Sequence, residues 1–142
     1  KSASSMKPVI IIIRRPKDAV RSLISRGYYP CAKLAFKHYY NFYSDIIKFK
    51  DNFVIVTFEQ LIDDPNIMVD KLNKKFSIQF IKNNKMNETA IQLLINESKG
   101  INSAIPSKDR IQKKELSDTL ISKITNSKWF NLSENIYQDF IR

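Results

Sequence analysis

The sequence predicts an α/β fold with a parallel sheet, and two observations support this prediction. Two short runs of apolar, mostly β-branched residues, Val9–Ile13 and Phe53–Phe58, have the length and composition of strands buried on both faces. Segments with helical patterning lie between and after them, so the strands are expected to pair in parallel through a helical crossover. The chain has 142 residues, which suffice for a single domain with one core.

The first two helices are expected between the strands. Pro16 suits the first helical position and Asp18 in the first turn interacts favourably with the helix dipole, so a helix is predicted from Pro16 to about Ser25. Apolar and aromatic positions at helical spacing predict one long amphipathic helix from Pro30 to about Lys50. The aromatic residues of this region are expected to lie mainly in the core: Tyr28, Tyr29, Phe36, Tyr39, Tyr40, Phe42 and Tyr43.

The rest of the chain is predicted to be helical. The sequence Asp63-Asp64-Pro65 combines an acidic cap with a proline and therefore predicts a helix start, with the helix running to about Phe76. Beyond it we expect, in chain order, a helix over 87–98, a loop over 100–111 that contains Pro106, and helices over 113–126 and 129–141.

Composition excludes several kinds of protein. With Cys31 as the only cysteine and His38 as the only histidine, an internal disulfide framework and a cysteine-based zinc site are excluded, and no metal is expected. Cys31 is expected to be small and buried, and His38 to be a packed or half-exposed helix residue. No apolar run approaches the roughly 18 residues that span a bilayer, so we expect a soluble protein, preferably cytoplasmic.

The net charge of +10 admits a polyanionic partner without requiring one. Lysines are spread along the chain without a block of five or six, and a composition rich in Lys, Ile and Asn is typical of AT-rich codons. A dedicated nucleic-acid surface is therefore not favoured. A site for a small polyanion needs only two or three placed cations, and the charge balance is compatible with it.

The main candidate site lies at the carboxyl end of the first strand, where open parallel sheets bind their ligands. Arg14 stands there, directly before a helix start. A guanidinium can hold phosphate through two parallel hydrogen bonds, and the helix N-terminus adds free N–H groups. Ser22, eight residues on, is expected to reach the same anion. In the alternative reading, Arg14 is a solvated cap and Ser22 is plain helix surface.

The residues around Arg14 resemble a segment of a known family. The segment 11–22, IIIRRPKDAVRS, resembles the R-x-P-x-D-x-x-x-S segment of sulfotransferases that use 3′-phosphoadenosine 5′-phosphosulfate (PAPS). In that family the Arg and the terminal Ser hold the 3′-phosphate of the donor. The resemblance therefore implies that Arg14 and Ser22 bind this phosphate.

Two further segments are similar to the same family. Residues 54–65 resemble its strand–YEDL–DP segment, although Phe58 stands where the family often has Tyr and Gln60 where it often has Asp. Ile105–Arg110 resembles a late basic loop that folds over the 3′-phosphate, which implies Lys108 and Arg110 as additional ligands. From its own position, Glu59 is expected to help fix the strand end through hydrogen bonds.

The resemblance implies a P-loop-like α/β domain with a central parallel sheet flanked by helices, incomplete at its N-terminus. Residues 1–142 are then the C-terminal part of a longer single domain, because the family's PKSGTT-like loop for the 5′-phosphosulfate lies upstream and is not in this sequence. The implied enzyme transfers a sulfuryl group from PAPS to a hydroxyl or amine acceptor, and this chain carries the 3′-phosphate-binding half without an assigned catalytic base. The alternatives are a non-catalytic sulfotransferase-like domain that binds a nucleotide or a partner, and a basic nucleic-acid-binding module.

Overall fold

A computed structural model describes residues 8–82 and 108–142 of the chain. Within these ranges the fold is α/β and mostly helical, with a small sheet of two strands, β1 (Val9–Ile13) and β2 (Phe53–Thr57). The two strands are parallel and pair along their whole length. The predicted parallel pair is thus confirmed, while a larger central sheet is not seen in this part of the chain.

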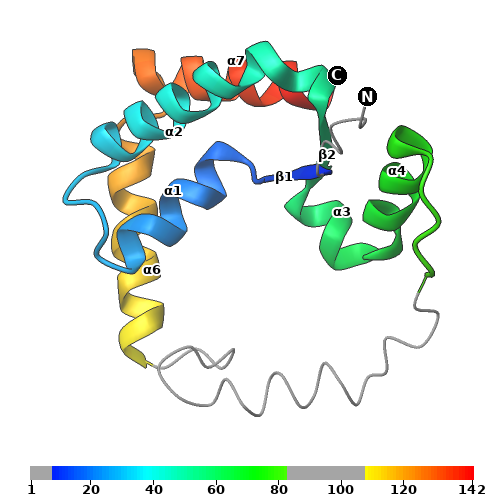
Figure 1. Ribbon diagram of the computed structural model, residues 1–142. Helices are drawn as coiled ribbons and strands as arrows, with labels where there is room; N and C mark the ends of the chain where they lie inside the picture. Colours follow the sequence, from blue (N-terminus) through cyan, green and yellow to red (C-terminus); the bar gives the residue numbers. More distant parts are fainter. Residues whose placement is uncertain (1–7, 83–107) are drawn as a thin grey trace.

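Helices account for most of the described residues. In chain order they are α1 (Pro16–Ser25), α2 (Ala32–Ile46), the 3-10 helix η1 (Ile47–Asn52), α3 (Phe58–Asp63), α4 (Asn66–Phe76), α6 (Lys108–Ser122) and α7 (Lys128–Ile141). Figure 1 shows α1, α2, α6 and α7 on one side of the two strands, and α3 and α4 on the other. None of the helices in the described ranges combines the length and the apolar character that crossing a bilayer requires.

The first strand is less buried than its composition predicts. Ile13 is fully buried, but Val9 and Ile12 keep 46% and 45% of their surface exposed. The expectation that β1 is buried on both faces is therefore wrong for the described part of the chain. The physical reason is that two strands alone cover little of each other, since a parallel sheet is normally buried by further strands and helices.

The predicted helices between the strands agree with the structure except at one point. Helix α1 has the predicted bounds, with Pro16 in its first turn. The long helix expected from Pro30 to Lys50 is instead α2 followed by the 3-10 helix η1. Short 3-10 segments commonly tighten the ends of α-helices, and the periodicity of the apolar residues does not reveal the change of pitch.

A short helix, α3, begins where the second strand was expected to continue. Thr57 caps it, since its hydroxyl accepts a hydrogen bond from the Gln60 backbone N–H at 3.1 Å. In return the Gln60 side chain accepts one from the Thr57 N–H at 3.2 Å, which completes a capping box. Phe58 therefore belongs to a helix and not to β2, and Gln60 performs the hydrogen bonding that was expected of Glu59.

The cap of α3 provides a test of this local account. Thr57→Ala removes the acceptor of the Gln60 N–H, and we expect it to lower the free energy of unfolding by about 1 kcal/mol in urea denaturation. Thr119→Ala is the matched control, because the exposed Thr119 hydroxyl only donates to the Glu115 carbonyl of its own helix. The control should change stability by less than about 0.5 kcal/mol. Equal losses in the two variants would contradict the capping role.

The helix α4 begins one residue later than the sequence predicts. The Asp64 carboxylate accepts a hydrogen bond from the Asn66 N–H at 2.9 Å, but Pro65 and not an acidic residue occupies the cap position, and its side chain makes no capping hydrogen bond. Pro65 has helical backbone angles and immediately precedes the first residue of α4. The helix ends at Phe76, and Ser77 adopts a left-handed conformation with φ of 53° that terminates it.

The boundaries of the late helices differ from the predictions. Helix α6 begins at Lys108 and ends at Ser122, so the loop expected over 100–111 is wrong at 108–111, and the helix expected over 113–126 is shifted. An acidic residue such as Asp109 suits the first turn of a helix, a signal that the proline nearby obscured. Helix α7 agrees with the expected 129–141 to within one residue. The helix expected over 87–98 lies outside the described residues.

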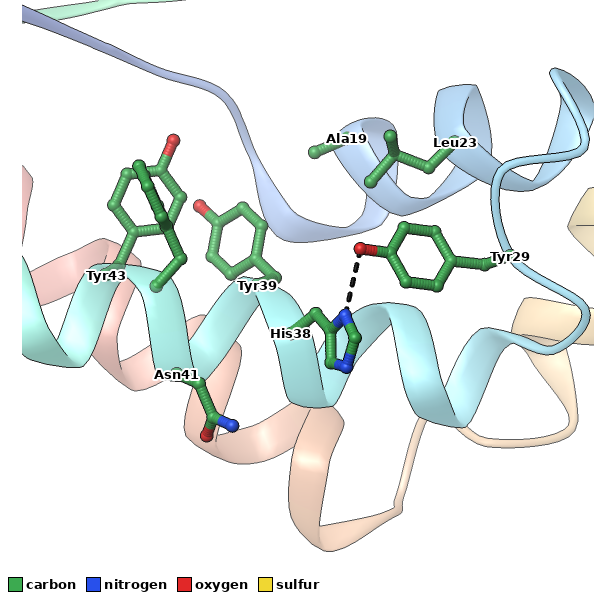
Figure 2. A pocket seen from close by; sticks show the side chains of 8 residues that line it. Ala19, Leu23, Tyr29, His38, Tyr39, Asn41 and Tyr43 are labelled. Atoms are coloured by element: carbon green, nitrogen blue, oxygen red, sulfur yellow. Dashed lines mark hydrogen bonds between the residues drawn. The ribbon is translucent and has the colours of Figure 1, made fainter.

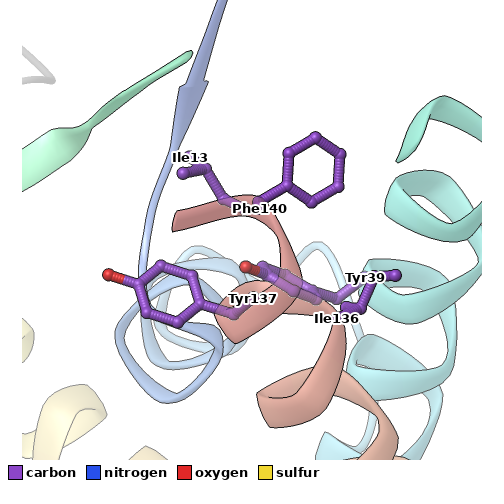
Figure 3. Packing of buried hydrophobic residues seen from close by; sticks show 5 residues of the cluster. All are labelled: Ile13, Tyr39, Ile136, Tyr137 and Phe140. Atoms are coloured by element: carbon purple, nitrogen blue, oxygen red, sulfur yellow. The ribbon is translucent and has the colours of Figure 1, made fainter. Parts of the chain in front are cut away.

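Three groups of buried side chains hold these elements together. One lies between β1, α2 and α7, and Figure 3 shows Ile13 of the strand beside Phe140 of α7. A second, which contains Phe36 and Val20, joins α1, α2 and α6. The third packs β2 against Leu72 of α4. The carboxyl end of β1 is therefore held between helices from both ends of the chain.

Candidate functional site

Arg14 lies at the carboxyl end of the parallel pair, as the sequence predicts. It directly follows Ile13, which pairs with Thr57 in β2. The register therefore places Arg14 beside Phe58, and the guanidinium carbon lies 4.6 Å from the centre of the Phe58 ring. Contacts of this kind stabilise a cation over an aromatic face. Phe58 thus supports the arginine with its ring and offers no hydroxyl.

The Arg14 side chain has an unsatisfied hydrogen-bond donor. Its Nε atom is buried and has no hydrogen-bond partner among the described residues. A buried donor without a partner costs free energy, and in native proteins such groups usually have a ligand, an ion or water as partner. The Nε of Arg14 is therefore a donor that none of the described residues satisfies.

The backbone of Arg14 is held by a tyrosine of α2. The Tyr39 hydroxyl donates a hydrogen bond to the Arg14 carbonyl oxygen at 2.7 Å. Burial raises the pKa of Tyr39 far above its ordinary value, and the nearby Tyr43 raises it further, so the hydroxyl keeps its proton and remains a donor. Sequence reasoning placed Tyr39 in the core, which is confirmed, but had no signal for this bond because it joins residues 25 positions apart.

The N-terminus of α1 completes this end of the sheet. Pro16 occupies the first turn, and the Ala19 N–H bonds the Arg15 carbonyl, so the N–H groups of Lys17 and Asp18 belong to the unpaired first turn. Such groups and the helix dipole attract anions. The site thus combines a guanidinium with the N-terminus of a helix that is ten residues long.

Arg21 does not contribute a free cation to this site. Its guanidinium pairs with Asp18 at 2.9 Å on its own helix and with Asp118 of α6 at 2.5 Å. These pairs tie α1 to α6 and neutralise the local charge. Arg15 is exposed and Lys17 is exposed as well, so both remain accessible near the helix start.

Ser22 lies on α1 but does not contact Arg14. Its carbonyl oxygen accepts hydrogen bonds from the Ser25 hydroxyl and the Arg26 N–H, while its own hydroxyl bonds no other described residue. Ser22 lies six positions after Pro16, which is about 9 Å along the helix axis. An anion held by both Arg14 and Ser22 would have to bridge between them.

The two basic residues of the late segment fall at the start of α6. The backbone of Lys108 and of Arg110 belongs to the first turn of this helix. Their side chains lie outside what the structure describes. Figure 1 shows this first turn at the end of α6 farther from α7. The predicted basic loop is therefore helical backbone from Lys108 onward.

A partly buried carboxylate lies close to the same strand end. Glu134 of α7 lines a cavity of about 470 Å³ together with Arg15, Lys17 and Tyr137. Burial raises the pKa of Glu134, and the positive charge of Arg15 partly counteracts this rise. Burial likewise raises the pKa of Tyr137, with Glu59 adding to the effect. Sequence reasoning missed both residues of α7 because they approach the strand only through tertiary packing.

The remaining expectations for single residues have different outcomes. Cys31 is exposed and not buried, because it occupies the extended position immediately before α2. His38 is exposed on α2, and its Nδ1 atom shares a hydrogen bond of 3.0 Å with the Tyr29 hydroxyl. Neither residue lies near the unpaired donor of Arg14 in any described contact.

The aromatic residues of α2 and of the connection before it divide into core and surface. Phe36 and Tyr39 are buried as expected, but Tyr28 and Phe42 keep 66% and 60% of their surface exposed. Tyr29, Tyr39, Phe42 and Tyr43 line a cavity of about 450 Å³ between α1 and α2, which Figure 2 shows from close by. The expectation of a mainly buried stripe is therefore correct only in part.

The chain was compared with protein-family models, curated proteins and solved structures, and none of these gives a match.

Proposed function

We propose that this chain carries the 3′-phosphate-binding half of a sulfotransferase, which transfers a sulfuryl group from PAPS to a hydroxyl or amine acceptor. The observation that carries the proposal is the buried Nε of Arg14, which lies at the carboxyl end of β1 directly before the N-terminus of α1 and has no partner among the described residues. In this proposal β1 and β2 form part of a P-loop-like central sheet. The segments around Arg14, Phe58 and Arg110 support the family assignment through their order and spacing.

The proposed roles of the residues are in binding and orientation. The Arg14 guanidinium, supported by the Phe58 ring, donates hydrogen bonds to the 3′-phosphate, and the Ser22 hydroxyl donates one from α1. The resemblance also implies Lys108 and Arg110, but the first half of α6 packs beside the C-terminal end of α1, away from Arg14, so a direct contact would require the start of α6 to move. Bound in this way, PAPS supplies an activated sulfuryl group for in-line attack by the acceptor. The described residues then contribute to catalysis by positioning the donor and stabilising charge on it.

The function is tested by calorimetric titration with 3′,5′-adenosine bisphosphate, the nucleotide that remains after transfer. We expect one binding event per chain and weaker binding of 5′-AMP, because 5′-AMP lacks the phosphate that Arg14 would hold. Equal affinity for the two nucleotides would show that the 3′-phosphate is not recognised. A nucleic-acid-binding module would instead bind long polynucleotides with a steep dependence on salt.

The role of Ser22 is smaller and has its own test. Ser22→Ala removes one hydroxyl donor, and we expect the affinity for 3′,5′-adenosine bisphosphate to fall about threefold to tenfold in the same titration. Ser25→Ala is the matched control on α1, because the Ser25 hydroxyl is already bonded to the Ser22 carbonyl. If the two variants bind equally well, Ser22 is ordinary helix surface.

A further inference from the structure

A polar cavity lies between the start of α1 and one face of α7. Its volume of about 470 Å³ falls within the range of about 300–1,000 Å³ that is typical of small-molecule sites. Arg15 and Lys17 line it from the start of α1. On α7 the lining residues follow helical spacing and therefore share one face of that helix: Glu134, Tyr137, Gln138 and Ile141.

Glu134 lines this cavity with a carboxylate that no described residue binds through a hydrogen bond or an ion pair. Its side chain is partly buried. Burial raises the pKa of Glu134, and the next largest influence is the positive charge of Arg15, which lowers it, so the carboxylate faces the start of α1. The other lining carboxylate, Asp18, is paired with Arg21 at 2.9 Å. Glu134 is therefore the carboxylate of this cavity that can accept hydrogen bonds from a ligand cation.

The opposite wall supplies two cations. Arg15 and Lys17 are exposed, and neither forms an ion pair with another described residue. Burial raises the pKa of Tyr137 and Arg15 counteracts this rise, so the guanidinium lies near the Tyr137 hydroxyl as well as near Glu134. A guanidinium can hold a carboxylate through two parallel hydrogen bonds, and a neighbouring ammonium adds a point charge. The cavity thus presents positive charge on its α1 side and negative charge on its α7 side.

We propose that the cavity between the start of α1 and α7 binds a small zwitterion of the α-amino-acid type, with its carboxylate at Arg15 and Lys17 and its ammonium group at Glu134. Opposite charges on the two walls favour a ligand that carries both charges, because a simple anion would be repelled by one wall and a simple cation by the other. Ile141 lines the same cavity with 42% of its surface exposed and offers apolar contact to an aliphatic side chain. This inference is independent of the proposed function, since none of the residues proposed to bind PAPS is among those that line the cavity.

The test is a calorimetric titration of the full chain with L-leucine and with two analogues that each lack one of its charges. The analogue 4-methylpentanoate has no ammonium group, and 3-methylbutylamine has no carboxylate. We expect saturable binding of L-leucine to one site per chain, and binding of each analogue about tenfold weaker because one set of charge-assisted hydrogen bonds is lost. The absence of saturable L-leucine binding, or an analogue that binds as tightly as L-leucine, would overturn the proposal.

Two variants assign the two ends of the ligand. Glu134→Gln should weaken L-leucine about tenfold and leave 4-methylpentanoate, which has no ammonium group, bound at least as tightly as before. Arg15→Ala should weaken L-leucine and 4-methylpentanoate alike but not 3-methylbutylamine. Glu115→Gln is the matched control, because Glu115 is exposed on α6 and does not line the cavity. L-Leucine binding that is insensitive to both Glu134→Gln and Arg15→Ala would place the ligand elsewhere and contradict the assignment.

Discussion

Replacing Arg14 with alanine is expected to lower the affinity for 3′,5′-adenosine bisphosphate about tenfold to a hundredfold. The reason is the loss of charge-assisted hydrogen bonds, each of which contributes roughly 1.5–3 kcal/mol. In the protein, the Arg14 guanidinium lies against the Phe58 ring, and its buried Nε has no partner among the described residues. Calorimetric titration of the wild type and the variant measures the difference directly.

Two companion variants separate the specific contact from general charge. Arg15→Ala removes the same charge from the next residue, whose side chain is exposed, and it should change the affinity less than about threefold. Arg14→Lys keeps the charge but loses the planar fork that binds phosphate through two hydrogen bonds, so most of the loss should persist. Equal losses of affinity for Arg14→Ala and Arg15→Ala would show that the nucleotide is attracted by positive charge in general and not held by a specific contact with Arg14.

The largest expected effect on stability is that of Phe36→Ala, at about 3–5 kcal/mol. Phe36 is fully buried in the cluster with Val20 and Ile121, and its ring meets that of Phe130 edge-on at a centroid distance of 5.2 Å. Its removal leaves a cavity between three helices that cannot easily close. Because domains of this size are stable by only about 5–15 kcal/mol, the variant should unfold at much lower urea concentration.

The control for this prediction is Phe42→Ala on the same helix. Phe42 keeps 60% of its surface exposed, so its removal should cost less than about 1 kcal/mol. Urea unfolding followed by circular dichroism compares the two variants under the same conditions. Similar losses at positions 36 and 42 would mean that the packing of α2 against α1 and α6 is not as described.

Local sequence signals were sufficient to predict the elements that begin or end at a proline or at an acidic residue. Pro16 and the preceding β-branched run define β1 and α1, and Asp64 with Pro65 defines the start of α4 to within one residue. The signal for α3 was also present, since Thr57 and Gln60 have the spacing of a capping box, but the apolar run of β2 extends into Phe58 and conceals it. Burial of β1 was overestimated because composition reports what a strand is suited to and not how many neighbours cover it.

Only the position of Arg14 along the backbone of the candidate site could be predicted from the sequence. The strand end and the following helix place Arg14 from sequence alone, whereas its support by Phe58 and Tyr39 depends on strand register and helix packing. The expected meeting of Arg14 with Ser22 is not seen as a contact. A spacing of eight residues fixes positions along the chain, but the direction in which an arginine side chain extends is decided by its neighbours.

The most direct test of the account is ³¹P NMR of 3′,5′-adenosine bisphosphate, because the two phosphates give separate resonances. The account predicts that the 3′-phosphorus resonance shifts on titration with the wild-type chain, and that Arg14→Ala largely abolishes this shift. A 3′-phosphorus resonance that does not respond to the wild type, or that shifts equally with Arg14→Ala, would contradict the assignment of this phosphate to the carboxyl end of β1.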